Sequence, residues 1–540
     1  SVAAVSPESA LMYEMDWSES SLEASGSTAK RSSDEASAAF LAKVSKAKPA
    51  KQFNVVLEAA QRVAADIMGL QSASEVDPHR QLMELGLDSM MAVDFVEALS
   101  NLIGADLDAT ITFDYPTMHH IATYLMSDIL NLTDKRAEDA GLDDSEKIDG
   151  VWLLFADSGG FAARVGSGIE ERGGSILTIN VGSAFDSSSF SQGVITVDPK
   201  SKIHWKKLFG LLATEHVDVR GVIHMWALDL TEGIPSDTDQ IHTTGCCSIL
   251  YLIQCLASSE FTRAQLTIVT RGAQAVACSG STLNLSSAPI WGFGQTVAQE
   301  HPANFNGLVD LGFVESDLET EAVQVVKEAC FADKEDRVAL RDGKRYVARL
   351  RRARAPNKSY DFRPDGTYLI TGGLGALGLA MCEWMATRGA SRLVLTSRSG
   401  MPSDPADDRI NAIKALEAKG VEVVVVAADA ADEIQMARAV AVANQEGHPL
   451  KGVVHAAGVL SFVQIASMSV QELKRVVKAK VDGTIILHKL TLGMPLDAFV
   501  LFSSISNVWG SSTMAHYGAG NEFLVSFAHY RTMQGLPGSA

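Results

Sequence analysis

Apolar residues along this chain follow two patterns, one helical and one of short strands alternating with longer segments. Residues 52–130 carry apolar positions at helical spacing and include a Tyr115–Pro116 break, which predicts a small helical domain. From residue 151 onward, short runs of Val, Ile and Leu alternate with longer mixed segments. That alternation is typical of a parallel α/β sheet.

The strand pattern runs once and then restarts, so we expect two successive doubly wound units, at 150–355 and 356–540. Only the second unit carries a clean phosphate-binding loop. The predicted strands are VWLLF (151–155), SILTINV (175–181), GVIHMW (221–226) and LTIVTRG (266–272), then TYLITGG (367–373), RLVLTS (392–397), VEVVVVAAD (421–429), GVVHAAG (452–458) and DAFVLFSS (497–504).

Two polar stretches separate these parts. Residues 18–51 are rich in Ser, Ala, Lys and Glu, and residues 131–149 are acidic. Neither stretch has enough large apolar side chains to bury much surface. We therefore expect both to be flexible linkers.

Composition excludes several classes of function. The net charge of −19 argues against a nucleic-acid partner, because phosphate binding requires clustered Lys and Arg. No run of about 18 apolar residues predicts a membrane span. The first residues carry neither a Met nor a signal pattern, so we expect an internal part of a longer polypeptide.

The cysteines also bear on the cellular compartment. None belongs to a Cys-x-x-Cys pair or stands near a His cluster, so we expect neither a disulfide framework nor a metal site. A reducing cytoplasm fits this usage. The six residues are Cys246, Cys247, Cys255, Cys278, Cys330 and Cys382.

The helical domain contains one motif with chemistry. In Leu85-Gly86-Leu87-Asp88-Ser89-Met90, Asp88 can cap the helix that follows, and the hydroxyl of Ser89 stands at its N-terminus. A phosphodiester at that position would meet favourable backbone dipoles. The motif, and FDYPT at 113–117, resemble acyl carrier proteins. In that family a phosphopantetheinyl transferase attaches 4′-phosphopantetheine to the serine that corresponds to Ser89.

The second α/β unit opens with a glycine-rich turn between a strand and a helix. Glycines there let the backbone approach a pyrophosphate at the helix N-terminus. The turn supplies seven candidate cofactor-binding residues: Thr371, Gly372, Gly373, Leu374, Gly375, Leu377 and Gly378.

Residues after the later strands complete the predicted cofactor site. Ser397 and Arg398 stand where an NAD-dependent enzyme would place an acidic residue, and a guanidinium suits the 2′-phosphate of NADPH. Asp429 is placed to meet the adenine. Ala456, Ala457 and Gly458 form the turn that flanks the cofactor.

Four further residues suggest ketone reduction, which needs a proton donor at the developing alkoxide. Tyr517 is followed four residues later by Asn521 rather than Lys, while Lys480 and Ser504 lie 37 and 13 residues upstream of Tyr517. This arrangement resembles polyketide synthase ketoreductases of the short-chain dehydrogenase superfamily. The resemblance implies Tyr517 as proton donor, Ser504 as second hydroxyl and Lys480 as the cation that acidifies the phenol. It also implies that Asn521 orients Lys480 and a water relay.

The resemblance further implies a stereochemical outcome. Reductases that give the D-hydroxy product carry Leu-Asp-Asp after the His-Ala-Ala-Gly turn, and residues 459–464 here read VLSFVQ. Trp509, eight residues before Tyr517, resembles the marker for the L-hydroxy product, known as A-type. The alternative is that Trp509 only forms a wall of the cleft. Met514 departs from the usual Gln or His, which leaves the handling of an α-substituent open.

The first α/β unit resembles the structural half of these reductases, with no cofactor expected at Asp157-Ser158-Gly159-Gly160. In the family, a strand like Tyr13-Glu14-Met15-Asp16-Trp17 begins this half. We therefore expect residues 1–17 to supply its first strand and the carrier at 52–130 to be an insertion. The family continues past GLPGSA into a last strand and a lid helix, so we expect the sequence to lack these parts.

The leading interpretation is a type I polyketide synthase segment that reduces a β-ketoacyl thioester with NADPH. Its expected partners are the ketosynthase and acyltransferase of the same synthase. Two alternatives stay open: a carrier and scaffold with a silent reductase, and a fatty-acid synthase reductase.

Overall fold

The computed structural model describes most of the chain from residue 40 onward and one short segment before it. The described residues are 12–19, 40–41, 43–44, 49–70, 72–73, 76–78, 80, 82, 85, 87, 89–105, 107, 111–114, 117–129, 147–235, 238–239, 241–257, 261, 263–276, 283–313, 317–331, 335–353 and 360–540. Most of both predicted linkers, Asp88, Tyr115–Pro116 and Cys278 lie outside these ranges. The chain divides into two units, Ser20–Asp143 and a second unit that joins Ser1–Glu19 to Asp144–Ala540.

The smaller unit is helical and has its own apolar core. Its helices are α2 (Pro49–Met68), α3 (Ser89–Ile103), α4 (Ile111–Asp114) and α5 (Met118–Tyr124), which continues as the π-helical turn η3 (Leu125–Ile129). Ala60 and Ala64 of α2 pack with Phe95 of α3 because helical spacing puts them on one face. Phe40 and Val44 are buried in the same core, so this unit begins before the predicted boundary at residue 52.

The larger unit contains two sheets, and the first forms the structural half. Its strand order is β1-β9-β8-β7-β6-β5-β2-β3-β4. Strands β2 to β8 pair in parallel, as helix-linked strands do. The strands are β1 (Met12–Glu19), β2 (Val151–Phe155), β3 (Ser175–Val181), β4 (Val194–Val197), β5 (Val219–His224), β6 (Gln265–Arg271), β7 (Phe305–Leu311), β8 (Arg337–Arg341) and β9 (Lys344–Ala353).

The edge of this sheet is antiparallel and unites distant parts of the chain. Strands β8 and β9 form a hairpin whose two turn residues, Asp342 and Gly343, have positive φ angles, as a two-residue hairpin requires. Strand β1 pairs antiparallel with β9 along its whole length, from Met12 opposite Ala353 to Glu19 opposite Tyr346. This is the pairing expected for residues 11–17. The helical unit is therefore inserted in the sequence between two strands of one sheet.

The second sheet forms the catalytic half and has the order β12-β11-β10-β13-β14, all parallel. Its strands are β10 (Thr367–Thr371), β11 (Arg392–Ser397), β12 (Glu422–Ala427), β13 (Leu450–His455) and β14 (Ala498–Leu501). Alternate residues face opposite sides, so Tyr368 and Ile370 pack in one core while Leu369 packs in another. Both the predicted doubly wound class and the predicted small helical domain are confirmed.

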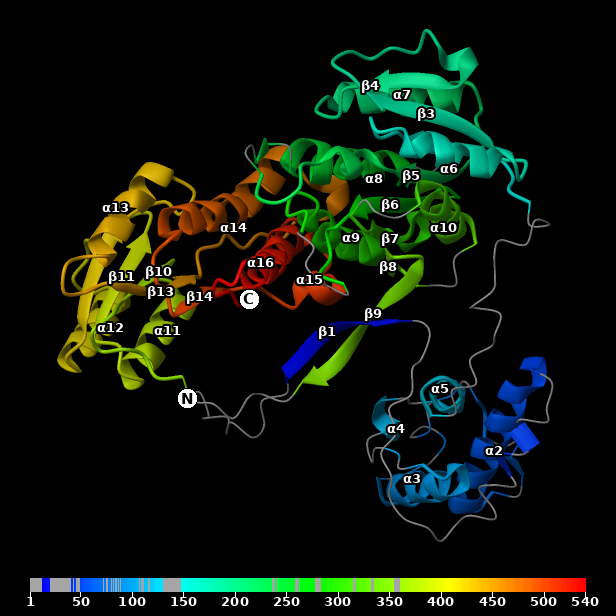
Figure 1. Cartoon of the computed structure of the whole chain (residues 1–540), viewed down its shortest axis with the longest axis horizontal. Helices are drawn as coiled ribbons and strands as arrows, with labels where there is room; N and C mark the ends of the chain where they lie inside the picture. The colour runs from blue at the N-terminus through cyan, green and yellow to red at the C-terminus, as the bar shows by residue number, and fades with distance from the viewer. Residues whose placement is uncertain are drawn as a thin grey trace. The chain divides into compact units, whose positions relative to one another are not determined.

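Helices cover both sheets (Figure 1). Those of the structural half are α6 (Phe161–Glu170), α7 (Lys202–Thr214), α8 (Ser248–Leu256), α9 (Ala288–Glu300) and α10 (Leu318–Cys330). Those of the catalytic half are α11 (Ala376–Thr387), α12 (Asp408–Ala418), α13 (Glu433–Ala443), α14 (Val470–Thr491), α15 (Ser506–Trp509) and α16 (Ala515–Met533). None of the helices in the described ranges is both long and apolar enough to cross a bilayer.

The two halves meet where α9 crosses α16 (Figure 1). The crossing is close because both contact positions are glycine: a Cβ on Gly292 would lie 2.1 Å from the carbonyl oxygen of Gly518. A Cβ on Gly518 would in turn lie 2.6 Å from the carbonyl oxygen of Gly292. Beside the crossing, the buried carboxylate of Glu522 accepts hydrogen bonds from Gln274 (2.9 Å) and Asn507 (2.6 Å). Helix α9 thus supplies the main contact between the halves.

Replacing Gly292 with alanine tests this crossing. We expect Gly292→Ala to lower the free energy of unfolding by about 1–3 kcal/mol, because the added methyl overlaps a backbone carbonyl. Gly210→Ala is the matched control, since Gly210 is also within a helix but a Cβ there meets nothing within 4 Å. The control should be neutral or slightly stabilising. Equal denaturant midpoints for the two variants would contradict the close crossing.

Candidate active site

The glycine-rich turn after β10 is shaped by backbone contacts. Gly372 has a φ of +66°, and a Cβ there would lie 2.9 Å from the backbone of Ala456 and Ala457. Gly378 packs on the same turn, where a Cβ would lie 2.5 Å from the carbonyl oxygen of Gly372. These positions therefore exclude side chains, and the turn lies directly against the Ala456–Gly458 turn.

The N-terminus of α11 is open to an anion, whereas that of α6 is not. Gly375 begins α11 without any side chain that caps the free backbone N–H groups. In the structural half, the Asp157 carboxylate accepts hydrogen bonds from the backbone N–H groups of Phe161 (3.0 Å) and Ala162 (2.7 Å). A phosphate could bind the first helix end but would meet a carboxylate at the second.

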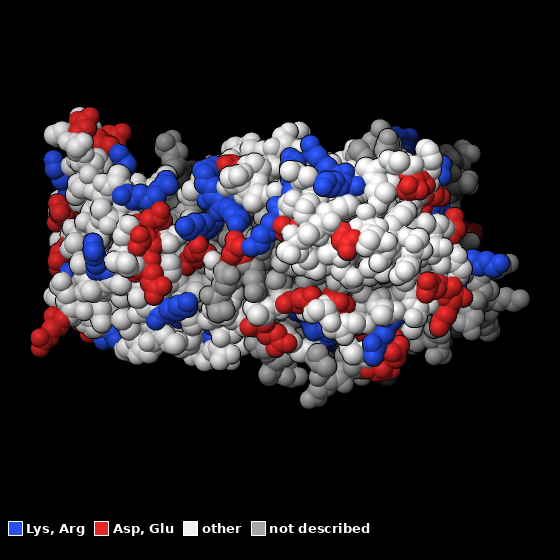
Figure 2. Space-filling view, turned by 90° about the horizontal axis from the view of Figure 1, so that it is seen from above, with Lys and Arg blue, Asp and Glu red and all other residues white. Residues whose placement is uncertain are grey.

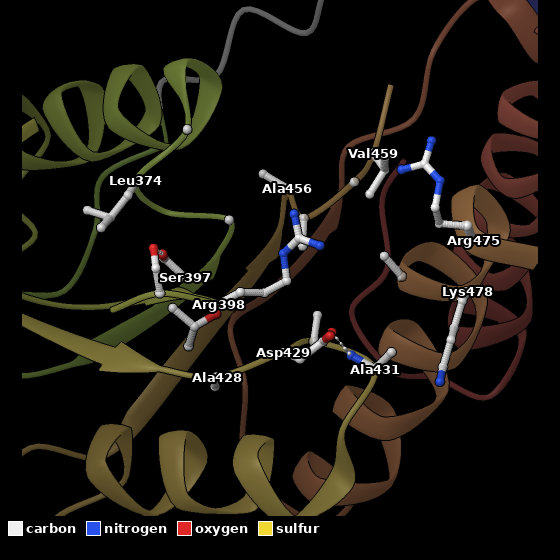
Figure 3. Close-up of a pocket in the computed structure, with 18 of the residues that line it drawn as sticks. Leu374, Ser397, Arg398, Ala428, Asp429, Ala431, Ala456, Val459, Arg475 and Lys478 are labelled. Atoms are coloured by element: carbon white, nitrogen blue, oxygen red, sulfur yellow. Dashed lines mark hydrogen bonds between the residues drawn. The ribbon is translucent and has the colours of Figure 1, made fainter. Parts of the chain in front are cut away.

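A cavity of about 540 Å³ opens over the glycine-rich turn (Figure 3). Nine of the thirteen predicted cofactor-binding residues line it: Gly372, Leu374, Gly375, Ser397, Arg398, Asp429, Ala456, Ala457 and Gly458. Thr371, Gly373, Leu377 and Gly378 do not. Leu377 is 63% exposed on α11, while Gly373 packs against Leu395. The Asp429 carboxylate accepts a hydrogen bond from the backbone N–H of Ala431 (3.0 Å), which holds it at the rim.

The cavity has more cations than the sequence analysis identified. Arg409, Arg475 and Lys478 line it together with Arg398. In Figure 3, Arg398 approaches from the β11 side and Arg475 and Lys478 approach from α14. Glu472 binds Arg475 and Asp407 binds Arg409, so these two guanidinium groups are partly neutralised. The sequence offered one indication for Arg475 and Lys478, because their i,i+3 spacing puts both on the same face of α14.

Cations occur on the surface despite the acidic total of the chain. Figure 2 shows one face on which Lys and Arg side chains lie among Asp and Glu side chains. Among the described residues, no group of three or more His, Cys, Asp or Glu side chains could hold a metal ion. The cations of the cavity therefore provide the main feature suited to an anionic ligand.

A buried hydrogen-bond network ties the two turns to α14. The His455 ring lies 2.6 Å through Nδ1 from the Thr371 hydroxyl and 3.1 Å through Nε2 from the Ala479 carbonyl oxygen. Burial, with the nearby Lys480 charge, lowers the pKa of His455 to about 3, so the ring is neutral. Its Nε2–H then donates to Ala479, and Nδ1 accepts from Thr371. Thr371 is thus a structural residue of the turn, and His455 is a residue that the sequence analysis did not select.

Lys480 and Tyr517 come together from α14 and α16. The Lys480 Nζ lies over the Tyr517 ring, 5.3 Å from its centroid, and donates a hydrogen bond to the Phe502 carbonyl oxygen (2.9 Å). The lysine side chain passes Gly458 and Gly520, where added Cβ atoms would lie 3.5 and 3.0 Å from it. Burial lowers the pKa of Lys480 to about 8. The structure thus brings a buried cation against the phenol from a different helix.

Asn521 and the paired serines complete this cluster. Asn521 is fully buried one turn beyond Tyr517, and its Nδ2 donates to the Tyr517 carbonyl oxygen (2.8 Å). Its Oδ1 accepts no hydrogen bond from the described protein atoms. Ser503 donates to the backbone carbonyl of Asn521 (3.1 Å), whereas the Ser504 hydroxyl accepts only a longer bond from the Ser506 backbone (3.3 Å). Of the two serine hydroxyls, that of Ser504 is therefore the more available to bind a ligand.

Trp509 stands at the end of α15 and is 51% exposed. Its backbone carbonyl accepts a hydrogen bond from Gln299 of α9 (2.6 Å), which fixes the backbone but leaves the indole free. The structure therefore presents the ring to solvent on the loop that also carries Ser504.

Comparisons with known families agree with this geometry. Residues 366–540 match the KR domain, residues 203–350 match the Rossmann fold domain of the polyketide synthase extender module SpnB, and residues 58–125 match the phosphopantetheine attachment site. The chain carries the ketoreductase and carrier domains of a type I polyketide synthase.

Curated relatives of the ketoreductase segment are large synthases. Polyketide synthase GfsB of Streptomyces halstedii is 35% identical over 405 residues, 72% of this chain and 7% of that protein. The 6-methylsalicylic acid synthase of Arthrobotrys oligospora is 36% identical over 315 residues, 56% of this chain and 17% of that protein. The chain thus spans only a small part of the relatives it matches.

Solved ketoreductases share the fold. An A-type ketoreductase from a modular polyketide synthase is 27% identical with a TM-score of 0.61, and covers 72% of this chain and 78% of its own. The first ketoreductase of the tylosin synthase is 29% identical with a TM-score of 0.59, and covers 73% of this chain and 81% of its own. The predicted family is confirmed, while the individual site residues stay predictions.

Replacing Lys480 with methionine tests the burial of its charge. The folded lysine loses its proton near pH 8 and the unfolded one near pH 10.5, so wild-type stability rises with pH between these values. Lys480→Met should therefore be the more stable protein below pH 8, by on the order of 3 kcal/mol. This advantage should shrink as pH approaches 10.5, as measured by denaturant unfolding. The exposed Lys414→Met is the control, and equal pH dependence of the two variants would contradict the buried charge.

Proposed function

We propose that this chain reduces a β-ketoacyl thioester to a β-hydroxyacyl thioester with NADPH. The observation that carries the proposal is the Lys480 ammonium over the Tyr517 ring, buried and supplied by a separate helix. A buried charge is costly unless it serves a specific partner. Together with the open helix N-terminus at Gly375, the cluster supports hydride reduction of a ketone.

The cavity fits a dinucleotide. The backbone N–H groups at the start of α11 suit the pyrophosphate, and Asp429 at the end of β12 suits the adenosine side. Arg398 extends into the same cavity and suits a 2′-phosphate, which favours NADPH over NADH. The Ala456–Gly458 turn would hold the nicotinamide end, close to Lys480.

NADPH, held by the glycine-rich turn, Asp429 and Arg398, would supply the hydride, and with it the two electrons, that reduce the β-carbon. Tyr517 donates its phenolic proton to the carbonyl oxygen, so the C=O group becomes CH–OH. The Lys480 ammonium stabilises the phenolate that remains. Ser504 holds the carbonyl oxygen, and Asn521 Oδ1 accepts from a water that returns a proton to Tyr517. We further propose that the product has the L-hydroxy configuration. Trp509 and the absence of an Asp pair after Gly458 support this proposal.

The stereochemical proposal does not rest on fold similarity. An A-type ketoreductase and a C2-type ketoreductase are alike in identity to this chain, both at 27%, with TM-scores of 0.61 and 0.58. The exposed Trp509 indole, on the loop that carries Ser504, is the feature that favours the L-hydroxy outcome. If Trp509 only forms a wall of the cleft, Trp509→Leu should leave the configuration of the product unchanged.

We propose that the carrier holds the substrate on a phosphopantetheine arm at Ser89, the first residue of α3. A phosphopantetheinyl transferase would attach the arm, and the ketosynthase and acyltransferase of the synthase would load and extend the acyl chain. The silent-scaffold alternative offers no reason for Lys480 to stay buried against Tyr517. The fatty-acid synthase alternative shares the chemistry and differs only in the parent assembly.

The catalytic role of Tyr517 is tested by its conservative replacement. Tyr517→Phe keeps the ring beneath Lys480 but removes the proton donor, so kcat should fall by about 10²-fold or more. The assay follows NADPH oxidation with a β-ketoacyl N-acetylcysteamine thioester, which bypasses the carrier. Tyr360→Phe, at an exposed tyrosine, should leave the rate unchanged. Full activity of Tyr517→Phe would reject the assignment, and a wild-type protein that binds NADPH but never reduces a thioester would favour the silent scaffold.

The role of Arg398 is tested through cofactor preference. Arg398→Gln removes the charge that would meet the 2′-phosphate, so kcat/KM for NADPH should fall about 10-fold or more, with kcat/KM for NADH nearly unchanged. Arg388→Gln is the matched control, because Arg388 pairs with Asp361 and does not line the cavity. An equal loss with both cofactors would show that Arg398 does not read the 2′-phosphate.

A further inference from the structure

Two loops flank the candidate catalytic groups, and neither carries a charged residue. The first, 456–464, follows β13, and the second, 502–514, follows β14. A hydrogen bond from the Val463 backbone N–H to the Thr513 carbonyl oxygen (2.8 Å) joins them. Because β13 and β14 are neighbouring parallel strands, both loops leave the same edge of the sheet. They therefore form one surface beside Ser504 and Tyr517.

This surface leaves large apolar side chains in water. Leu460 and Phe462 on the first loop are 58% and 63% exposed, and Ile505 and Trp509 on the second are 43% and 51% exposed. These are four of the sixteen large apolar side chains that are exposed among the described residues. Single exposed apolar residues are ordinary, but a concentration on two joined loops indicates a binding surface.

Three of the nine polar side chains on the two loops bond to the protein. Ser461 donates to Glu472, Ser503 donates to the Asn521 carbonyl oxygen, and Asn507 donates to Glu522. These groups are thus engaged in holding the loops rather than available to a ligand. A hydroxyl or charged group that contacts Leu460 or Phe462 would lose water without gaining a hydrogen bond from that side chain.

The first loop begins in the wall of the cofactor cavity and continues into the apolar surface. Val459 lines the cavity and Leu460 is the next residue, while Ser504 is followed by Ile505. An acyl chain whose carbonyl is held by Ser504 and Tyr517 would therefore extend over these side chains. This continuity identifies the occupant as the substrate chain itself.

We infer that the acyl chain reduced at this site is a hydrocarbon near its β-keto group, aliphatic or aromatic, and not a hydroxylated or carboxylated chain. The inference rests on the proposed ketoreductase function and adds the chemical class of its substrate. Apolar contact with Phe462 and Leu460 selects the chain, and the uncharged loops disfavour polar ones.

Two thioesters of equal length test this inference on the full chain with NADPH. They are the N-acetylcysteamine thioesters of 3-oxooctanoate and 5-hydroxy-3-oxooctanoate, which differ close to the β-keto group. We expect kcat/KM for the hydrocarbon chain to exceed that for the hydroxylated chain by about 10-fold. Phe462→Ser should bring this ratio close to one, because it removes an apolar contact that distinguishes the two chains.

Leu492→Ser is the matched control, because Leu492 is 61% exposed but follows α14, away from both loops. It should leave the substrate ratio at its wild-type value. Equal kcat/KM for the two octanoyl thioesters in the wild type, or a ratio that Phe462→Ser does not change, would overturn the inference.

Two further outcomes are distinguishable. If a second copy of the chain covers this surface, sedimentation would show a dimer that Phe462→Ser dissociates, and the substrate ratio would stay near one, which overturns the inference. If no thioester is reduced, including 3-oxobutanoyl, the proposed ketoreductase function fails and this inference fails with it.

Discussion

The contact between the backbones of Gly292 and Gly518 is the constraint on which the rest of the reductase depends. It lets α16 lie directly against α9, so that a helix of the catalytic half becomes the main contact with the structural half. Several residues of α16 then contact different parts of the protein. Tyr517 faces Lys480, and Gly520 leaves space for that lysine. Glu522 accepts hydrogen bonds from Gln274 and Asn507. A shift of this helix would move the phenol and the subdomain interface together.

This constraint explains why a half without a usable phosphate site is part of the enzyme. The helix end that could bind phosphate in the structural half is already capped by Asp157. What that half provides instead is α9, along with hydrogen bonds to the loops around the site, including those from Gln299 to Trp509 and from the Ile465 backbone to Glu300. The burial of Glu522 raises its pKa, which fits a carboxyl held in a dry interface rather than one exposed to solvent.

Much of this arrangement could be predicted from the sequence because its signals are local. A strand, a glycine-rich turn and a helix are contiguous, so the cofactor cavity and nine of its lining residues were predicted. Residues that meet in the fold but lie far apart in the sequence were harder to predict. Arg475 and Lys478 of α14, and the His455 bond to Thr371, depend on how helices and strands come together. The carrier boundary was placed too late because Phe40 and Val44 lie in a polar stretch and only the packed core reveals their role.

The pairing of β1 with β9 gives the carrier insertion a physical basis. Strand β1 comes before the carrier in sequence and completes the edge of a sheet whose other strands come after it. Closing a long loop adds little further entropy cost with each added residue, so a whole domain can be placed between two such strands. The edge strand itself covers β9, which would otherwise present unpaired backbone groups.

We propose that Lys480 and Tyr517 form the site at which a hydride and a proton reach one carbonyl group. The most direct measurement is mass spectrometry of the product formed from a β-ketoacyl thioester and NADPH deuterated at C4 of the nicotinamide, on the face that transfers. We expect a β-hydroxyacyl thioester with one deuterium on the β-carbon. An unreduced ketone in the presence of folded, NADPH-bound protein would contradict it, as would a product without deuterium on that carbon.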